Sequence, residues 1–163
     1  MGSITDNQAT PRTIHISRFC IEKMTENSGN RDDRHTVLFV CTHNAGRSQM
    51  AAGYMKALSN GKIEVLSAGP VPKDTINPVA IAAMAEDGID IANNVPKLLT
   101  QESVAVSDIV ITMGCGDVCP IYPGKRYQDW ALEDQAGKSI EAVRSSRDEI
   151  KKLVETLLSQ LTN

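Results

Sequence analysis

The sequence lacks any apolar run of the roughly 18–20 residues that a membrane-spanning helix needs. Its first residues do not show the basic-then-apolar pattern of a secretory signal peptide. It contains four cysteines, and thiols without an export signal are typical of a reducing compartment. We therefore expect a cytoplasmic protein that does not bind a membrane.

The chain also lacks a strong excess of positive or negative charge. The net charge is −3, so nothing in the overall charge indicates binding to nucleic acid or to an anionic membrane surface. Hydrophobic residues make up 41% of the chain and charged residues 23%, which is a soluble globular profile. A length of 163 residues suffices for one domain with one core of ordinary size.

The most informative segment is an apolar, strand-like run that ends in a cysteine. Cys41 follows the run Val37–Val40, and five small or polar residues lead to Arg47 and Ser48, which open a helical pattern. Backbone N–H groups in such a loop point inward and the helix N-terminus adds positive potential, so the loop can hold a tetrahedral oxyanion. Arg47 can clamp two oxygens of that anion. The predicted binding residues are Thr42, His43, Asn44, Ala45, Gly46, Arg47 and Ser48.

Cys41 lies in the floor of this predicted anion site. The same positive field favours its thiolate form, so the segment indicates covalent chemistry on phosphate or a phosphate mimic. The alternative is a buried, inert thiol at a strand end. A buried, inert thiol would not explain why Asn44 and Gly46 follow it, since these residue types tolerate the left-handed backbone of a curled loop. Ser48 can hydrogen-bond the thiolate or simply cap the helix, and His43 is assigned no catalytic role.

From residue 36 onward, strand patterns alternate with helical patterns. Short apolar segments predict strands at 36–40, 63–67, 109–113 and 126–130. Helical spacing predicts helices at 48–58, 78–87 and 100–107, and a last helix with apolar residues Ile150, Leu153, Val154, Leu157, Leu158 and Leu161. This order predicts an α/β domain with a four-stranded parallel sheet flanked by helices. Ligands of such sheets bind at the carboxyl ends of the strands, where Cys41 and Cys115 both fall.

Residues 1–35 form a separate polar extension before the predicted domain at 36–163. Ile14 to Met24 can form a short amphipathic helix. The extension is therefore either a mobile tail or an arm for packing or dimerisation, which leaves a homodimer open. Cys20 lies in this segment and is assigned no role.

The pattern C-x5-R-S after a strand resembles the low-molecular-weight protein tyrosine phosphatase superfamily and its arsenate reductases. The resemblance runs from Thr36 to the C-terminus through an ordered series of short matches. These matches are Arg47-Ser48-Gln49-Met50-Ala51, Ser67-Ala68-Gly69, Asn77-Pro78, Gly88-Ile89-Asp90-Ile91, Ser107 through Met113, and Trp130 before Glu133-Asp134. The resemblance implies a fold like that of the low-molecular-weight phosphatases.

Two branches of this superfamily differ beyond the loop. A phosphatase would carry an Asp-Pro pair followed by tyrosines that grip a phenyl ring. Here Asp134 is followed by Gln135, those tyrosines are missing, and aromatic residues make up only 4% of the chain. Instead, Cys115 and Cys119 follow the third strand. Because arsenate reduction needs two electrons, the resemblance implies an arsenate reductase of the three-cysteine, thioredoxin-coupled, actinobacterial type.

The same resemblance assigns roles to the site residues. Cys41 attacks arsenic, Asp134 matches the proton donor, Cys115 attacks the Cys41 sulfur, and Cys119 then attacks Cys115. Gly114 and Gly116 flank Cys115 and give it freedom to swing. If residues 115–119 formed a regular helical turn, the Cα atoms of Cys115 and Cys119 would lie roughly 6 Å apart, within disulfide range.

Other interpretations of the cysteine pair are weaker. Zinc ligation lacks a second Cys/His pair at ligand spacing. A dinucleotide loop lacks its third glycine, and a structural disulfide is unexpected without an export signal. No metal and no bound cofactor are predicted. The expected partners are arsenate and an external thiol reductant, which is a thioredoxin-like protein or mycothiol with mycoredoxin. The functional alternatives are a reductase that uses a small thiol, a phosphatase acting on a phosphorylated protein, and a phospho-binding module.

Overall fold

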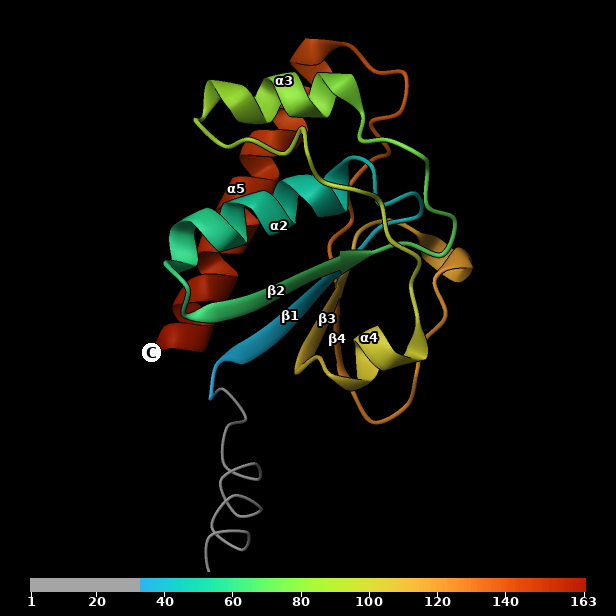
Figure 1. Cartoon of the computed structure of the whole chain (residues 1–163), viewed down its shortest axis with the longest axis vertical. Helices are drawn as coiled ribbons and strands as arrows, with labels where there is room; N and C mark the ends of the chain where they lie inside the picture. Colours follow the sequence, from blue (N-terminus) through green and yellow to red (C-terminus); the bar gives the residue numbers. More distant parts are fainter. Residues whose placement is uncertain (1–32) are drawn as a thin grey trace, which may run out of the picture. The chain divides into compact units, whose positions relative to one another are not determined.

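A computed structural model of the protein describes residues 33–163 (Figure 1). Four strands form one parallel sheet in the order β2-β1-β3-β4. The strands are β1 (His35–Val40), β2 (Ile63–Ala68), β3 (Ile109–Thr112) and β4 (Arg126–Asp129). The helices are α2 (Arg47–Ser59), α3 (Pro78–Glu86), α4 (Gln101–Ala105) and α5 (Ile140–Thr162), with a 3₁₀ turn, η2 (Gly116–Val118). The predicted α/β class and four-stranded parallel sheet are confirmed.

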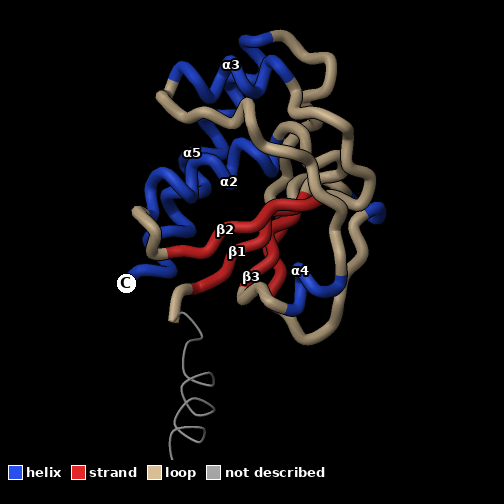
Figure 2. The backbone as a smooth tube through the Cα atoms, viewed as in Figure 1, coloured by secondary structure: helices blue, strands red, loops and turns tan. Residues whose placement is uncertain are grey.

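The central strand β1 sets the register of the sheet. Val37 faces Val65 of β2 on one side and Ile109 of β3 on the other. Since all strands are parallel, their carboxyl ends meet at one edge of the sheet (Figure 2). Cys41 and Gly114 lie just beyond this edge, after β1 and β3 respectively. The register therefore brings the two predicted functional segments to the same end of the molecule.

Side chains of β1 alternate between two apolar cores, as the two-residue period of a strand requires. Val37 and Phe39 belong to the larger core, which contains buried residues of α2, α3 and α5. Leu38 and Val40 belong to a smaller core on the other face, which includes Val104 of α4. Figure 1 shows the same division, with α2, α3 and α5 on one side of the sheet and α4 on the other. One face is thus thickly covered and the other thinly.

The last helix, α5, supplies the apolar face that the sequence predicts. Ile150, Val154 and Leu157 are buried in the larger core, and the remaining predicted apolar residues are partly buried against it. The helix is also tied to the end of α3 by ion pairs. Glu86 contacts Arg144 at 2.7 Å and Arg147 at 2.7 Å. Hydrogen bonds from these two guanidinium groups lower the pKa of Glu86 to about 2.

The structure corrects several predicted boundaries. The helix predicted at 100–107 is shorter in the structure, where α4 ends at Ala105. Thr100 is the N-cap of α4 and accepts from Ser103 N at 3.1 Å, and Val106 is the C-cap. The hypothetical helical turn at 115–119 is a 3₁₀ turn instead. β1 begins at His35, one residue inside the predicted extension. The predictions for residues 1–32, including Cys20 and the helix from Ile14 to Met24, lie outside the described residues.

Candidate active site

The loop between β1 and α2 carries the predicted oxyanion site. Cys41 follows the last residue of β1, and α2 begins at Arg47 with Gly46 as its N-cap. The end of β2 approaches the loop very closely at Gly69. A Cβ on Gly69 would lie 2.5 Å from the Cys41 carbonyl oxygen, so only glycine fits there. The loop is therefore held between the ends of two neighbouring strands.

Asn44 shapes the loop from within. It is fully buried and has a left-handed backbone with φ of 48°, a conformation that asparagine tolerates better than most residues. Its Nδ2 donates to Ser48 Oγ at 2.7 Å, and its Oδ1 accepts from Gln49 Nε2 at 3.0 Å and Lys97 N at 2.9 Å. Asn44 was predicted as a loop residue, whereas the sequence gives no role to Gln49 or Lys97. Lys97 is far away in the chain, so no local pattern could have revealed its contact.

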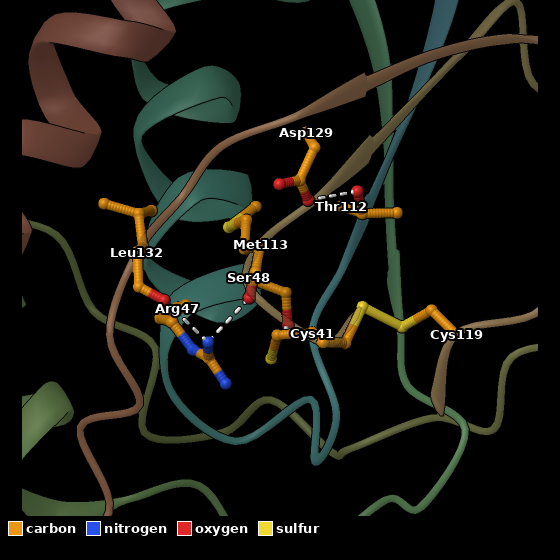
Figure 3. Close-up of a disulfide and its surroundings, with 9 residues drawn as sticks. Cys41, Arg47, Ser48, Thr112, Met113, Cys119, Asp129 and Leu132 are labelled. Carbon is orange, nitrogen blue, oxygen red and sulfur yellow. Dashed lines mark hydrogen bonds between the residues drawn. A yellow bond between two sulfur atoms is a disulfide. The ribbon is translucent and has the colours of Figure 1, made fainter. Parts of the chain in front are cut away.

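A short hydrogen-bond chain ends on the thiol of Cys41. Ser48 Oγ lies 2.9 Å from Cys41 Sγ, and both residues are buried (Figure 3). Because Asn44 already donates to Ser48 Oγ, the Ser48 hydroxyl hydrogen is free to point at the sulfur. This contact holds the sulfur in place at the floor of the loop.

Arg47 is held in place by two backbone carbonyls. Its Nη1 donates to Met113 O at 2.6 Å and to Leu132 O at 3.1 Å (Figure 3), and the residue is only 4% exposed. Both hydrogens of Nη1 are thereby used. The edge formed by Nε and Nη2 is the one that can present two parallel N–H donors to an oxyanion. These contacts thus fix the orientation of the Arg47 guanidinium group.

A small cavity opens above this loop. It measures about 20 Å³, where one enclosed water needs roughly 10–15 Å³, so it suits a small ion better than a phenyl ring. Its lining residues are Cys41, His43, Ala45, Gly46, Arg47, Lys73, Asn77, Asp134, Gln135 and Ala136. Three residues of the predicted set do not line the cavity, namely Thr42, Asn44 and Ser48. Asn44 and Ser48 instead form a buried hydrogen bond with each other inside the loop. Lys73 was missed by the sequence analysis; its backbone N–H donates to His43 O at 3.1 Å.

Asp134 is brought to the cavity rim from the loop after β4. Its Oδ1 lies 3.8 Å from Arg47 Nη2 and accepts from Ala136 N at 3.0 Å. Burial opposes ionisation of Asp134, but the Ala136 N–H and the positive charge of Arg47 outweigh it and hold its pKa below the ordinary value. Asp134 is therefore a carboxylate at neutral pH in this state. To donate a proton it must first gain one, for example from a protonated oxyanion that enters the site.

Cys115 and Cys119 form a disulfide with a Cα–Cα distance of 5.7 Å, while Cys41 is a free thiol. The two disulfide residues pack in the smaller core, whereas Cys41 belongs to the larger core on the opposite face. Gly114 and Gly116, with φ of 64° and 52°, flank Cys115. The three cysteines thus share an edge of the sheet, but the disulfide pair lies on the other side from Cys41.

Among residues 33–163, no group of three His, Cys, Asp or Glu side chains is placed to hold a metal ion. No helix in the same range is both long and apolar enough to cross a membrane.

The model of the low molecular weight phosphotyrosine protein phosphatase family matches residues 36–163. The chain belongs to this family. The match covers β1, the Cys41 loop and every later element, as the sequence resemblance predicted. Arsenate reductase 2 of Staphylococcus epidermidis is 40% identical over 128 residues, which are 76% of this chain and 96% of that protein. The glutaredoxin arsenate reductase of a Synechocystis species is 39% identical over 129 residues, covering 77% of this chain and 98% of that protein.

Solved structures give a consistent comparison. The thioredoxin-dependent arsenate reductase of Corynebacterium glutamicum superposes with a TM-score of 0.71 at 37% identity, covering 88% of this chain and 71% of that one. The YwlE arginine phosphatase of Geobacillus stearothermophilus superposes with a TM-score of 0.69 at 26% identity, covering 78% of this chain and 92% of that one. The fold is thus shared by reductases and phosphatases. The choice between the two activities depends on the site.

Proposed function

We propose that this protein reduces arsenate to arsenite with electrons from an external dithiol. The observation that carries the proposal is a cysteine pair, Cys115 and Cys119, at the same sheet edge as an oxyanion loop with Cys41 and Arg47. Arsenate reductases that are about 40% identical to the chain support it. Phosphate hydrolysis has no use for a second and third thiol, since it requires one nucleophile and a water.

The first step forms a covalent adduct. Arsenate binds in the loop, with two of its oxygens on Nε and Nη2 of Arg47. The Cys41 thiolate attacks arsenic and one As–O bond breaks. Asp134 takes a proton from the bound, protonated arsenate and passes it to the departing oxygen, which leaves as water, so the carboxyl group at the cavity rim serves as the general acid. Arsenic remains pentavalent at this stage.

The next two steps move electrons between thiols. The Cys115 thiolate attacks the Cys41 sulfur, a Cys41–Cys115 disulfide forms, and the electron pair of the breaking S–As bond stays on arsenic, which leaves as arsenite. The Cys119 thiolate then attacks the Cys115 sulfur and returns Cys41 as a thiolate. An external dithiol protein of the thioredoxin type, in the reducing cytoplasm that the sequence predicts, reduces the Cys115–Cys119 disulfide and restores both thiols.

The position of the disulfide favours one alternative route. Cys115 and Cys119 pack in the smaller core, away from the face on which Cys41 lies. A small thiol such as mycothiol could attack the Cys41 adduct directly, and the cysteine pair would then matter little. This route keeps the roles of Cys41, Arg47 and Asp134 unchanged.

Serine variants of the four cysteines separate these functions. Arsenite release and arsenate-dependent NADPH oxidation are measured with thioredoxin and thioredoxin reductase, and in parallel with mycothiol and mycoredoxin. We expect Cys41→Ser to make no arsenite, Cys119→Ser to release about one arsenite per site and stop, and Cys115→Ser to release none without another thiol. Cys20→Ser is the matched control and keeps full turnover.

The other outcomes point to the alternatives. Full turnover of Cys115→Ser with mycothiol alone would replace the relay by the small-thiol route. No arsenite with either reductant, together with rapid hydrolysis of para-nitrophenyl phosphate, would indicate a phosphatase. Substantial arsenate reduction by Cys41→Ser would refute the proposal.

A further inference from the structure

Gln135 is buried in a loop whose other residues are mostly exposed. It is 4% exposed, whereas Glu133, Asp134 and Ala136 around it are all exposed. A long polar side chain enters the interior only when specific hydrogen bonds compensate for its desolvation. Its burial beside the residue assigned as proton donor therefore calls for an explanation.

The Gln135 amide group joins this loop to α5. Nε2 donates to Glu133 O at 2.8 Å and to Ser146 Oγ at 2.6 Å. The orientation of the amide follows from chemistry, because a backbone carbonyl can only accept and must therefore face the NH₂ group. Oε1 is buried and has no hydrogen-bond partner within residues 33–163. Since this orphan acceptor costs free energy, the two bonds made by Nε2 must be what keeps the side chain inside.

Asp134 lies between two fixed points of its loop. On one side, Leu132 is buried and its carbonyl accepts from Arg47 Nη1 at 3.1 Å. On the other side, Gln135 is tied to Ser146 of α5. Gln135 also lines the cavity together with Asp134. Within residues 33–163, the hydrogen-bond and ion-pair partners of the Asp134 side chain are the Ala136 N–H and, at 3.8 Å, Arg47.

We infer that Gln135 is a positioning residue for proton transfer, which holds Asp134 at the cavity rim by anchoring its loop to Ser146 of α5. The inference rests on the proposed function, specifically on Asp134 as proton donor. General acids contribute roughly 10²–10⁴-fold, and a misplacement of about 1 Å can cost on the order of 10²-fold in rate. Loss of the anchor should therefore lower the rate of adduct formation without abolishing arsenate binding.

The test measures single-turnover arsenite formation and the KM for arsenate across pH. Gln135→Met keeps the length of the side chain but removes both hydrogen bonds, and Ser146→Ala removes the partner on α5. We expect each to lower the single-turnover rate about tenfold, with KM changed less than about threefold. Ser146→Thr, which keeps a hydroxyl, should restore the rate. Ser145→Ala, at an exposed neighbouring position on the same helix, is the matched control and should have the wild-type rate.

Combination with Asp134→Asn separates positioning from general loss of structure. Once the proton donor is gone, its anchor has nothing left to position, so Asp134→Asn with Gln135→Met should be no slower than Asp134→Asn alone. Gln135→Met should also make the single-turnover rate less dependent on pH, as Asp134→Asn should. Additive losses, or a Gln135→Met enzyme with the wild-type rate, would overturn the inference. A wild-type rate for Asp134→Asn would instead refute the proton-donor role in the proposed function.

Discussion

The Cys41 loop and the Cys115–Cys119 segment lie at the same edge of the sheet but are held very differently. The loop is fixed by side-chain bonds of Asn44, by Ser48 beneath the thiol and by the close approach of Gly69. The disulfide segment contains a short 3₁₀ turn, in which the Val118 N–H donates to Cys115 O at 3.2 Å, and Cys115 itself lies between two glycines of positive φ. The loop is held by side chains and backbone from several elements, whereas the second segment is held by its own disulfide and a local backbone hydrogen bond.

The difference matches what each region must do in the proposed reaction. An oxyanion site gains most from donors that are already in place, because no reorganisation is then required during the chemical step. A thiol relay requires one sulfur to reach two different partners in turn. Arg47 joins the two regions, since its Nη1 donates to Met113 O, one residue before Gly114. Substitutions at four residues test this difference between the two regions and the scaffold that carries them.

Arg47→Lys should have the largest effect, because it removes the anion clamp and the link to the second region together. A lysine cannot make two parallel hydrogen bonds to an anion or reach both carbonyls in the same geometry. We expect kcat/KM for arsenate to fall by about 10²–10³-fold, as measured in the coupled assay.

The matched control for Arg47→Lys is Arg147→Lys. Arg147 is also buried, but it bonds Ala83 O and Glu86 far from the cavity. Arg147→Lys should lower the thermal midpoint of unfolding and leave kcat/KM for arsenate close to the wild-type value. A near-normal kcat/KM for Arg47→Lys would argue against oxyanion binding at this residue.

Alanine at the two glycines around Cys115 should give smaller and unequal effects. A Cβ on Gly114 would lie 2.3 Å from Leu132 O and 2.8 Å from Arg47 Nη1, so Gly114→Ala must displace the clamp. A Cβ on Gly116 would meet nothing within 4 Å, so Gly116→Ala adds only left-handed strain of about 1–2 kcal/mol. We expect Gly114→Ala to lower single-turnover arsenite formation about tenfold or more, and Gly116→Ala to slow mainly steady-state turnover.

Each glycine variant serves as the control for the other, since both place a Cβ beside the same cysteine. Rapid-quench and steady-state rates measured on one preparation distinguish the first step from the thiol steps. Equal losses in both rates for both variants would contradict a division of labour between the Cys41 loop and the Cys115–Cys119 segment.

The smallest effect concerns the ion pairs that join α3 to α5. The pKa of Glu86 is about 2 in the folded protein, against 4.5 for the unperturbed group. Because the folded-state pKa is the lower one, Glu86 stabilises the fold fully above about pH 4.5 and loses that contribution as pH falls towards 2. Urea midpoints measured between pH 7 and 3 should therefore fall less steeply in Glu86→Gln. Glu155→Gln, an exposed carboxyl of α5, should follow the wild-type curve.

Much of the fold was predictable because its signals are local. Buried parallel strands appear as continuous apolar runs such as Val37–Val40, and α5 shows its core face at helical spacing. The predicted boundaries of α4 were wrong because Thr100, which was counted as part of the helix, is the N-cap residue just outside it. Gln49 and Lys73 were missed because their partners in the site are set by the path of the loop rather than by any motif.

The predicted anion-binding loop could be found from the sequence, since Cys41, Arg47 and the five residues between them are contiguous and local geometry forces them together. The way Arg47 is held depends on the tertiary structure, because Met113 and Leu132 reach it from 66 and 85 residues away. The tertiary structure also packs the disulfide in the smaller core and ties Gln135 to α5. Such contacts depend on strand order and on which face of the sheet a side chain enters, and neither is encoded in the spacing of residues along the chain.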